Sequence, residues 1–133
     1  MQVDPYTHAK YVHSPKFNLE WPKGYGFCFL SANADKDGKL YSLVLFAKHL
    51  NWVFLDSASD RNGNTFQVVK MDSQADSGWC EESVTVMLTK FDLEEAALVG
   101  LDIKVIGKRG DVVVVLPASY VSGFLAKANE EIQ

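Results

Sequence analysis

The stretch GFCFLSANADKDGKLYSLVLFAK, from Gly26 to Lys48, decides the fold because it holds two β-prone runs around a turn signal. The runs Gly26–Ala32 and Leu40–Lys48 are rich in the aromatic and large aliphatic residues of strands that bury at least one face. Between them lies Asp37-Gly38, a pair that hairpin turns favour because they need a positive φ. The stretch therefore predicts an antiparallel hairpin.

The turn region NADKDGKL also has the start of a calcium-loop pattern, which gives a second interpretation. Oxygen-bearing side chains stand at alternate positions, Asn33, Asp35 and Asp37, and Gly38 follows them. A helix–loop–helix calcium site also needs a bidentate glutamate at position 12 of the loop, and here that position is Val44. The flanking runs are predicted strands rather than helices. A hairpin turn is therefore our expectation, with weak calcium binding as the alternative.

The same alternation of β-prone runs and turn residues continues on both sides of this hairpin. Asn62-Gly63 repeats the turn signal. The segment Ser14–Gly24 contains two prolines and is predicted to be an irregular crossing, and Asp72–Glu82 is predicted to be a polar loop. Further strands are predicted at Tyr6–His13, Asn51–Ala58, Thr65–Met71, Ser83–Thr89, Leu101–Gly107 and Asp111–Pro117.

The last third of the chain adds two helices to this β-rich pattern. Asp92 and Gly100 are suitable capping residues for a short helix near 92–100. Apolar residues at helical spacing predict an amphipathic helix near 117–129. Between the two helices, the run Val112–Leu116 is apolar at every position, so it predicts a strand at the centre of its sheet. The fold class is therefore α+β, mainly antiparallel β, in a single domain of residues 1–133.

Length and charge restrict the function more than any motif does. The chain has 133 residues and a net charge of −4, and its longest basic cluster is a pair. Direct binding to nucleic acid is therefore not expected, since phosphate contacts need clustered lysine and arginine. No apolar run approaches the ~20 residues of a membrane span. The start MQVDPYTHAK lacks the features of a signal peptide, so a cytoplasmic location is expected unless Met1 replaces a removed signal.

No catalytic or cofactor-binding motif is present, so we expect neither an enzyme nor a cofactor. The three histidines His8, His13 and His49 lack the spacing of a zinc set. Cys28 lies in an apolar run, and Cys80 lies beside two glutamates that disfavour a thiolate. A disulfide between these cysteines is allowed but not required by the spacing. An enzyme with an unrecognised site remains an alternative.

Large aromatic residues in polar surroundings are the best candidates for a binding surface. Phe17, Trp21 and Tyr25 belong to the predicted proline-rich loop, and Trp79 lies in the predicted polar loop. Such residues either cover the core or anchor a partner. As anchors, they predict a protein partner.

Three segments give the chain a resemblance to a known group: VDPYTHAKYVHSPKF, NWVFLDSASDRNGN and IKVIGKRGDVVVVLPASYVSGFLAK. In these segments it resembles small bacterial proteins of unknown function that are described as exported proteins or lipoproteins. The resemblance implies a place in the cell envelope and brings no site residues. We therefore expect a non-enzymatic domain that binds a macromolecule. The alternative is a small acidic inhibitor from a phage or mobile element, such as an anti-CRISPR protein, that binds a protein target.

Overall fold

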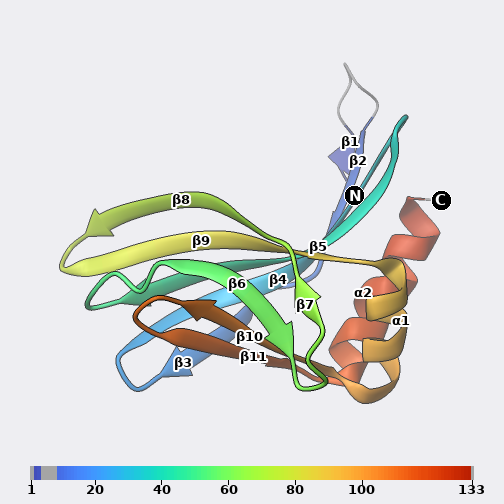
Figure 1. The fold of residues 1–133 in the computed structure, drawn as a ribbon. Helices are drawn as coiled ribbons and strands as arrows, with labels where there is room; N and C mark the ends of the chain where they lie inside the picture. The colour runs from blue at the N-terminus through green and yellow to red at the C-terminus, as the bar shows by residue number, and fades with distance from the viewer. Residues whose placement is uncertain (1, 4–8, 133) are drawn as a thin grey trace.

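The hairpin predicted at Gly26–Lys48 is the longest feature of the computed structural model, which describes residues 2–3 and 9–132. Its strands are β4 (Gly24–Asp35) and β5 (Gly38–His49), and they pair along their whole length (Figure 1). The loop between them is Lys36–Asp37, so the chain reverses one residue earlier than predicted. The Asp35 carboxylate accepts the backbone N–H of Asp37 at 2.8 Å. Gly38 has φ +131°, a conformation that side chains disfavour.

The strands form two sheets, a seven-stranded sheet A and a four-stranded sheet B. In sheet A the order is β1-β2-β4-β5-β9-β8, and β3 pairs with the same edge of β4 as β2 does. In sheet B the order is β11-β10-β6-β7. The other strands of sheet A are β1 (Gln2–Val3), β2 (Lys10–His13), β3 (Phe17–Trp21), β8 (Val68–Asp76) and β9 (Trp79–Leu88). The strands of sheet B are β6 (Leu55–Asp60), β7 (Thr65–Phe66), β10 (Leu101–Gly107) and β11 (Asp111–Leu116).

One hydrophobic core fills the space between the two sheets, which each contribute alternate residues of their strands. Among the largest fully buried side chains, Leu30, Leu43 and Val86 come from sheet A, and Ile103 and Leu116 come from sheet B. The α+β fold with mainly antiparallel sheets is confirmed. No helix in the described part of the chain is long and apolar enough to cross a membrane.

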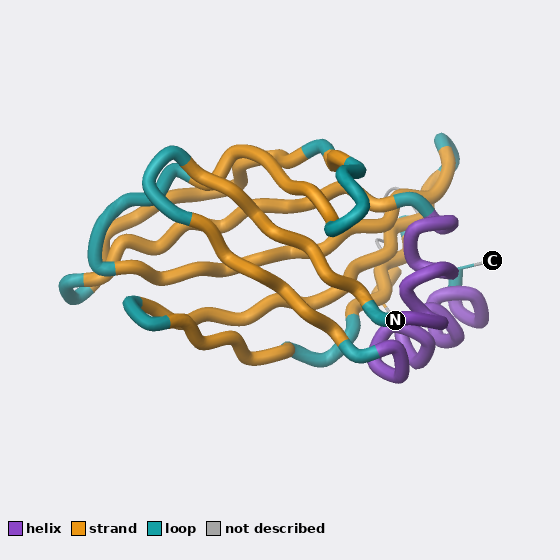
Figure 2. Tube along the Cα trace, turned by 60° about the horizontal axis from the view of Figure 1, so that its bottom comes forward, coloured by secondary structure: helices purple, strands orange, loops and turns teal. Residues whose placement is uncertain are grey.

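The two helices, α1 (Lys90–Val99) and α2 (Ala118–Glu131), pack together at one end of the strands (Figure 2). Both were predicted, with slightly different bounds. The N-cap of α1 is Thr89, whose hydroxyl accepts the N–H of Asp92 while the Asp92 carboxylate accepts the N–H of Thr89. Asp92 is thus the third residue of the helix rather than its cap. The helix ends at Gly100, as predicted.

Two segments predicted to be irregular are strands instead. The chain from Phe17 to Trp21 forms β3, because its alternate residues Phe17, Leu19 and Trp21 pack against the core while β4 satisfies its backbone. The predicted polar loop Asp72–Glu82 contains the hairpin between β8 and β9, whose turn is Ser77–Gly78. The predicted first strand at Tyr6–His13 is seen as β2, and its residues 6–8 lie outside the described residues.

The prediction that Val112–Leu116 forms a central strand is wrong. This run lies in β11, which is the edge of sheet B and, among the described residues, pairs with β10 alone. Val112, Val114 and Leu116 are buried, whereas Val113 and Val115 are 52% and 54% exposed. The strand therefore has one buried face and one apolar face in solvent.

Candidate functional site

The four aromatic residues predicted to form a binding surface all lie in strands, and the structure brings two of them into contact on the outside of sheet A. Tyr25 of β4 and Trp79 of β9 meet edge to face, with ring centroids 5.1 Å apart. Tyr25 is 43% exposed. Both side chains stand on the outer face, because they alternate with residues that face the core.

Trp21 and Phe17 face inward and so belong to the covering of the core. The Trp21 ring lies 5.0 Å from that of His49, which is buried in the same row across the sheet. Phe17 packs edge to face on Tyr120 of α2, with centroids 5.4 Å apart. The Tyr120 hydroxyl is in turn bonded to Ser14 at 2.7 Å. Phe17 is therefore not part of a surface with Tyr25 and Trp79, and Trp21 reaches that surface only at its rim.

The Tyr25–Trp79 pair is one end of a longer line of rings on the outer face of sheet A. Phe27 of β4 stacks on Phe46 of β5 at 4.8 Å, Phe46 lies 6.4 Å from Phe29, and the Phe29 ring lies 5.4 Å from that of His13. Tyr25 and Phe27 are neighbours on one face of β4. We call this line the aromatic row; its members are Trp79, Tyr25, Phe27, Phe46, Phe29 and His13.

Two lysines stand beside the rings of the aromatic row. The Nζ atom of Lys16 lies 4.4 Å from the centroid of Phe27, and that of Lys48 lies 5.6 Å from the centroid of Tyr25. Lys48 also forms an ion pair with Glu81 at 3.7 Å. Both lysines fall within the distance at which a cation is attracted to the face of a ring. They add positive charge beside the rings.

Two hollows adjoin the aromatic row. One, of about 430 Å³, lies where the strands turn and is lined by Trp21, Tyr25, Leu50 and Trp79 among others. The other, of about 450 Å³, runs from Phe46 over β9 to β8 and is lined by side chains that include Met71, Gln74 and Glu81. Leu50 and Met71 are 55% and 50% exposed. Exposed apolar side chains thus adjoin the row at both hollows, although the second hollow is lined mainly by polar residues.

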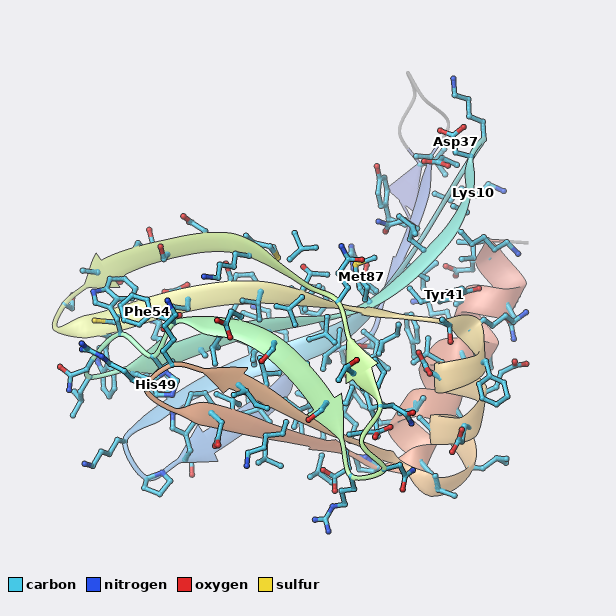
Figure 3. All side chains as sticks on the ribbon, viewed as in Figure 1. Lys10, Asp37, Tyr41, His49, Phe54 and Met87 are labelled. Carbon is cyan, nitrogen blue, oxygen red and sulfur yellow. The ribbon has the colours of Figure 1, made fainter. Side chains whose placement is uncertain are left out.

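Behind the row, on the core side of the same strands, two ionisable residues are buried. Figure 3 shows His49 with Phe54 at the end of the strands away from the helices. Burial lowers the pKa of His49, and the nearby Glu82 opposes this more weakly. Both oxygens of the Glu82 carboxylate accept backbone N–H groups, those of Val53 and Leu55, each at 3.0 Å. This carboxylate is engaged with the backbone and holds the chain segment between β5 and β6.

The two cysteines are free and differ in environment. Cys28 lies in the core, where burial raises the pKa of its thiol to about 12. Cys80 is half-buried and pairs across the sheet with His49, and its Sγ contacts the carbonyl oxygen of Leu50 at 3.9 Å. In this structure the bridge that the sequence left open is not formed.

The residues of the calcium alternative lie at the tip of the β4–β5 hairpin, where Figure 3 labels Asp37. Asn33 and Asp35 belong to β4, and Asp37 is in the turn. One oxygen of Asp35 is already bonded to the backbone of Asp37. Within residues 2–3 and 9–132, no three His, Cys, Asp or Glu side chains gather as a metal ion would require.

Comparison of the chain with models of known families, with curated proteins and with solved structures gives no match. The function is therefore inferred from the residues of the chain themselves. Phe27, Phe29 and Phe46 were missed by the sequence analysis, which assigned them to the strands of the central hairpin without separating the two faces. The signal was present in GFCFL, where Phe27 and Phe29 alternate with Cys28 and Leu30.

Proposed function

We propose that this chain is a non-enzymatic protein-binding domain whose contact surface is the outer face of sheet A, centred on the aromatic row. The observation that supports this is the row itself, in which the Tyr25–Trp79 pair lies beside a chain of four contacting rings on the side of the sheet that faces away from the core. Outer faces of antiparallel sheets are usually polar. Aromatic residues are enriched at the centres of protein interfaces, where they contribute most of the binding energy.

The charges around the row define the partner. Lys16 is exposed and stands over Phe27, and Lys48 stands over Tyr25 while paired with Glu81. A partner that covers the rings with apolar side chains brings any carboxylate at its rim close to these lysines. We therefore expect a protein that presents an apolar strip flanked by acidic residues. The resemblance to exported bacterial proteins supports a place for this contact in the cell envelope.

Site-specific photo-crosslinking in the native host tests the proposal. A photoreactive phenylalanine analogue at position 46 should give a discrete protein adduct, because Phe46 is central in the row. The same analogue at position 91 is the matched control, since Phe91 is 70% exposed on α1 and lies outside the aromatic row. The Tyr25→Ala/Phe27→Ala variant should lose the adduct while its melting temperature shows a folded domain. Adducts of equal yield at both positions, or an adduct that survives the double substitution, would contradict the proposal.

A further inference from the structure

The edge of sheet B is a second surface at which a partner is expected. β11 ends the sheet, and its outward side chains Val113 and Val115 are exposed. Proteins normally protect such edges with lysine, proline, bulges or covering segments, because a bare edge pairs with other strands. The strand from Asp111 to Leu116 contains neither lysine nor proline, and its register with β10 is continuous. Apart from Asp111 at its start, this edge is therefore apolar and lacks these protections.

The hairpin geometry shows which backbone groups of β11 point to the open side. The N–H of Gly107 is bonded to the carbonyl of Gly110 at 2.8 Å, so these residues form a hydrogen-bonded pair. Bonded and non-bonded pairs alternate along antiparallel strands, which makes Val112, Val114 and Leu116 the residues bonded to β10. The N–H and C=O groups of Asp111, Val113 and Val115 therefore point away from the sheet.

We propose that β11 pairs antiparallel with β11 of a second copy of this chain, in a two-fold dimer centred on Val113. The outward groups are spaced evenly on both sides of Val113. In this register Val113 meets Val113 of the second copy, and Asp111 meets Val115 at each end. Every outward N–H and C=O of these three residues then finds a partner, and sheet B continues from one subunit into the other.

A second copy fits this edge better than an unrelated strand because the edge is complementary to itself. The Val113 side chains of the two copies cover each other on the outer face. Each Asp111 lies opposite a valine rather than opposite the other Asp111, and it stays paired with Lys104 of its own chain at 3.3 Å. No like charges meet along the seam.

The same geometry limits assembly to two copies. A two-fold contact uses the same edge in both subunits, so each copy has no second β11 edge left to extend the assembly. Gly110 and Pro117 bound the strand and keep the seam short. A short seam predicts a reversible dimer that depends on concentration. The seam lies on sheet B and the aromatic row on sheet A, so each proposal can fail independently of the other.

Sedimentation equilibrium of the purified chain, from micromolar to millimolar concentration, measures the dimer. Val113→Pro is the decisive variant: the N–H that proline removes points outward, so the ladder with β10 stays intact while the seam loses its central bonds. Val113→Lys is the second variant, since its side chain stays in solvent in the monomer and places two like charges at the two-fold axis. Leu98→Lys is the matched control, because Leu98 is 82% exposed on α1.

We expect a dimer in the wild type and in Leu98→Lys. In both Val113 variants the dissociation constant of the dimer should rise by at least about tenfold. The circular dichroism spectra of all four proteins should agree. Amide exchange at Val113 and Val115 should slow as the wild-type concentration rises. A wild type that remains monomeric throughout overturns the proposal. So does a dimer that both Val113 variants leave unchanged, because its interface then lies elsewhere.

Discussion

The segment between β5 and β6 depends on one buried carboxylate, and replacing it tests how this end of the sandwich is held. Glu82 is 6% exposed. Its two oxygens accept the N–H groups of Val53 and Leu55 at 3.0 Å each, across a bend in which Phe54 has φ +59°. A non-glycine residue adopts such a φ only where its surroundings hold it there. We therefore predict that Glu82→Gln loosens this bend and destabilises the domain.

The magnitude follows from the two hydrogen bonds. Glutamine has nearly the same shape, but it offers one acceptor oxygen, and its amide nitrogen then faces a backbone N–H. One charge-assisted hydrogen bond is lost and one buried N–H loses its partner, which together cost about 3 kcal/mol of unfolding free energy. With a denaturant dependence of about 2 kcal/mol per M for a domain of this size, the urea midpoint should fall by about 1.5 M.

The neighbouring substitution Glu81→Gln is the matched control. Glu81 stands on the opposite face of the same strand, and its ion pair with Lys48 is 3.7 Å long and partly exposed. Losing such a pair costs less than about 1 kcal/mol. Amide exchange should accelerate at Val53 and Leu55 in Glu82→Gln and stay unchanged in Glu81→Gln. Equal urea midpoints in the two variants would refute the reasoning.

Three further predictions concern single residues elsewhere in the sheets and helices. Burial lowers the pKa of His49, and Glu82 opposes this more weakly. The folded protein therefore favours the neutral ring. The stability that the neutral ring contributes is present above the ordinary pKa of 6.5 and is lost as the pH falls from there through the folded-state pKa. His49→Gln should flatten the pH profile of the melting temperature in this range, and identical profiles would contradict it. Thr89→Ala removes one half of the capping box and should lower the free energy of unfolding, measured in urea, by about 1 kcal/mol. Thr89→Ser keeps the hydroxyl and should retain most of the wild-type stability. Iodoacetamide should label Cys80 in the native protein and reach Cys28, whose pKa is raised to about 12, only after unfolding; equal labelling rates would be the opposite result.

Local signals in the sequence were sufficient for the central hairpin and for both helices. The β4–β5 hairpin was predicted because Asp37-Gly38 lies between two β-prone runs, and a two-residue turn between long runs leaves few alternatives. Gly100 was correctly predicted to end the first helix. The start of that helix was misplaced because Thr89 and Asp92 are both good capping residues, and the choice between them depends on where β9 ends.

The candidate surface was harder to predict because it depends on which strands become neighbours. Tyr25 and Trp79 were selected as aromatic residues in polar surroundings, and Trp79 lies 54 positions after Tyr25. They meet only because β5 lies between β4 and β9 in sheet A. Phe17 satisfied the same criterion and packs inward on Tyr120, since helix α2 covers that end of the core. Composition alone does not distinguish these two outcomes.

The error at β11 has the same physical origin as the omission of Phe27, Phe29 and Phe46. An apolar run on both faces of a strand predicts that both faces are covered, but it does not say what covers them. In Val112–Leu116 one face is covered by the core and the other is exposed at the edge of sheet B. In β4 the core covers Cys28 and Leu30, while Phe27 and Phe29 stand on the outer face of sheet A. We therefore propose that each two-faced apolar strand that is not enclosed within the monomer marks a surface for a partner; in this chain the two such surfaces lie on different sheets. A domain with one partner on each sheet can dimerise through β11 while its aromatic row stays free to bind a second protein, so the dimer would present two such rows.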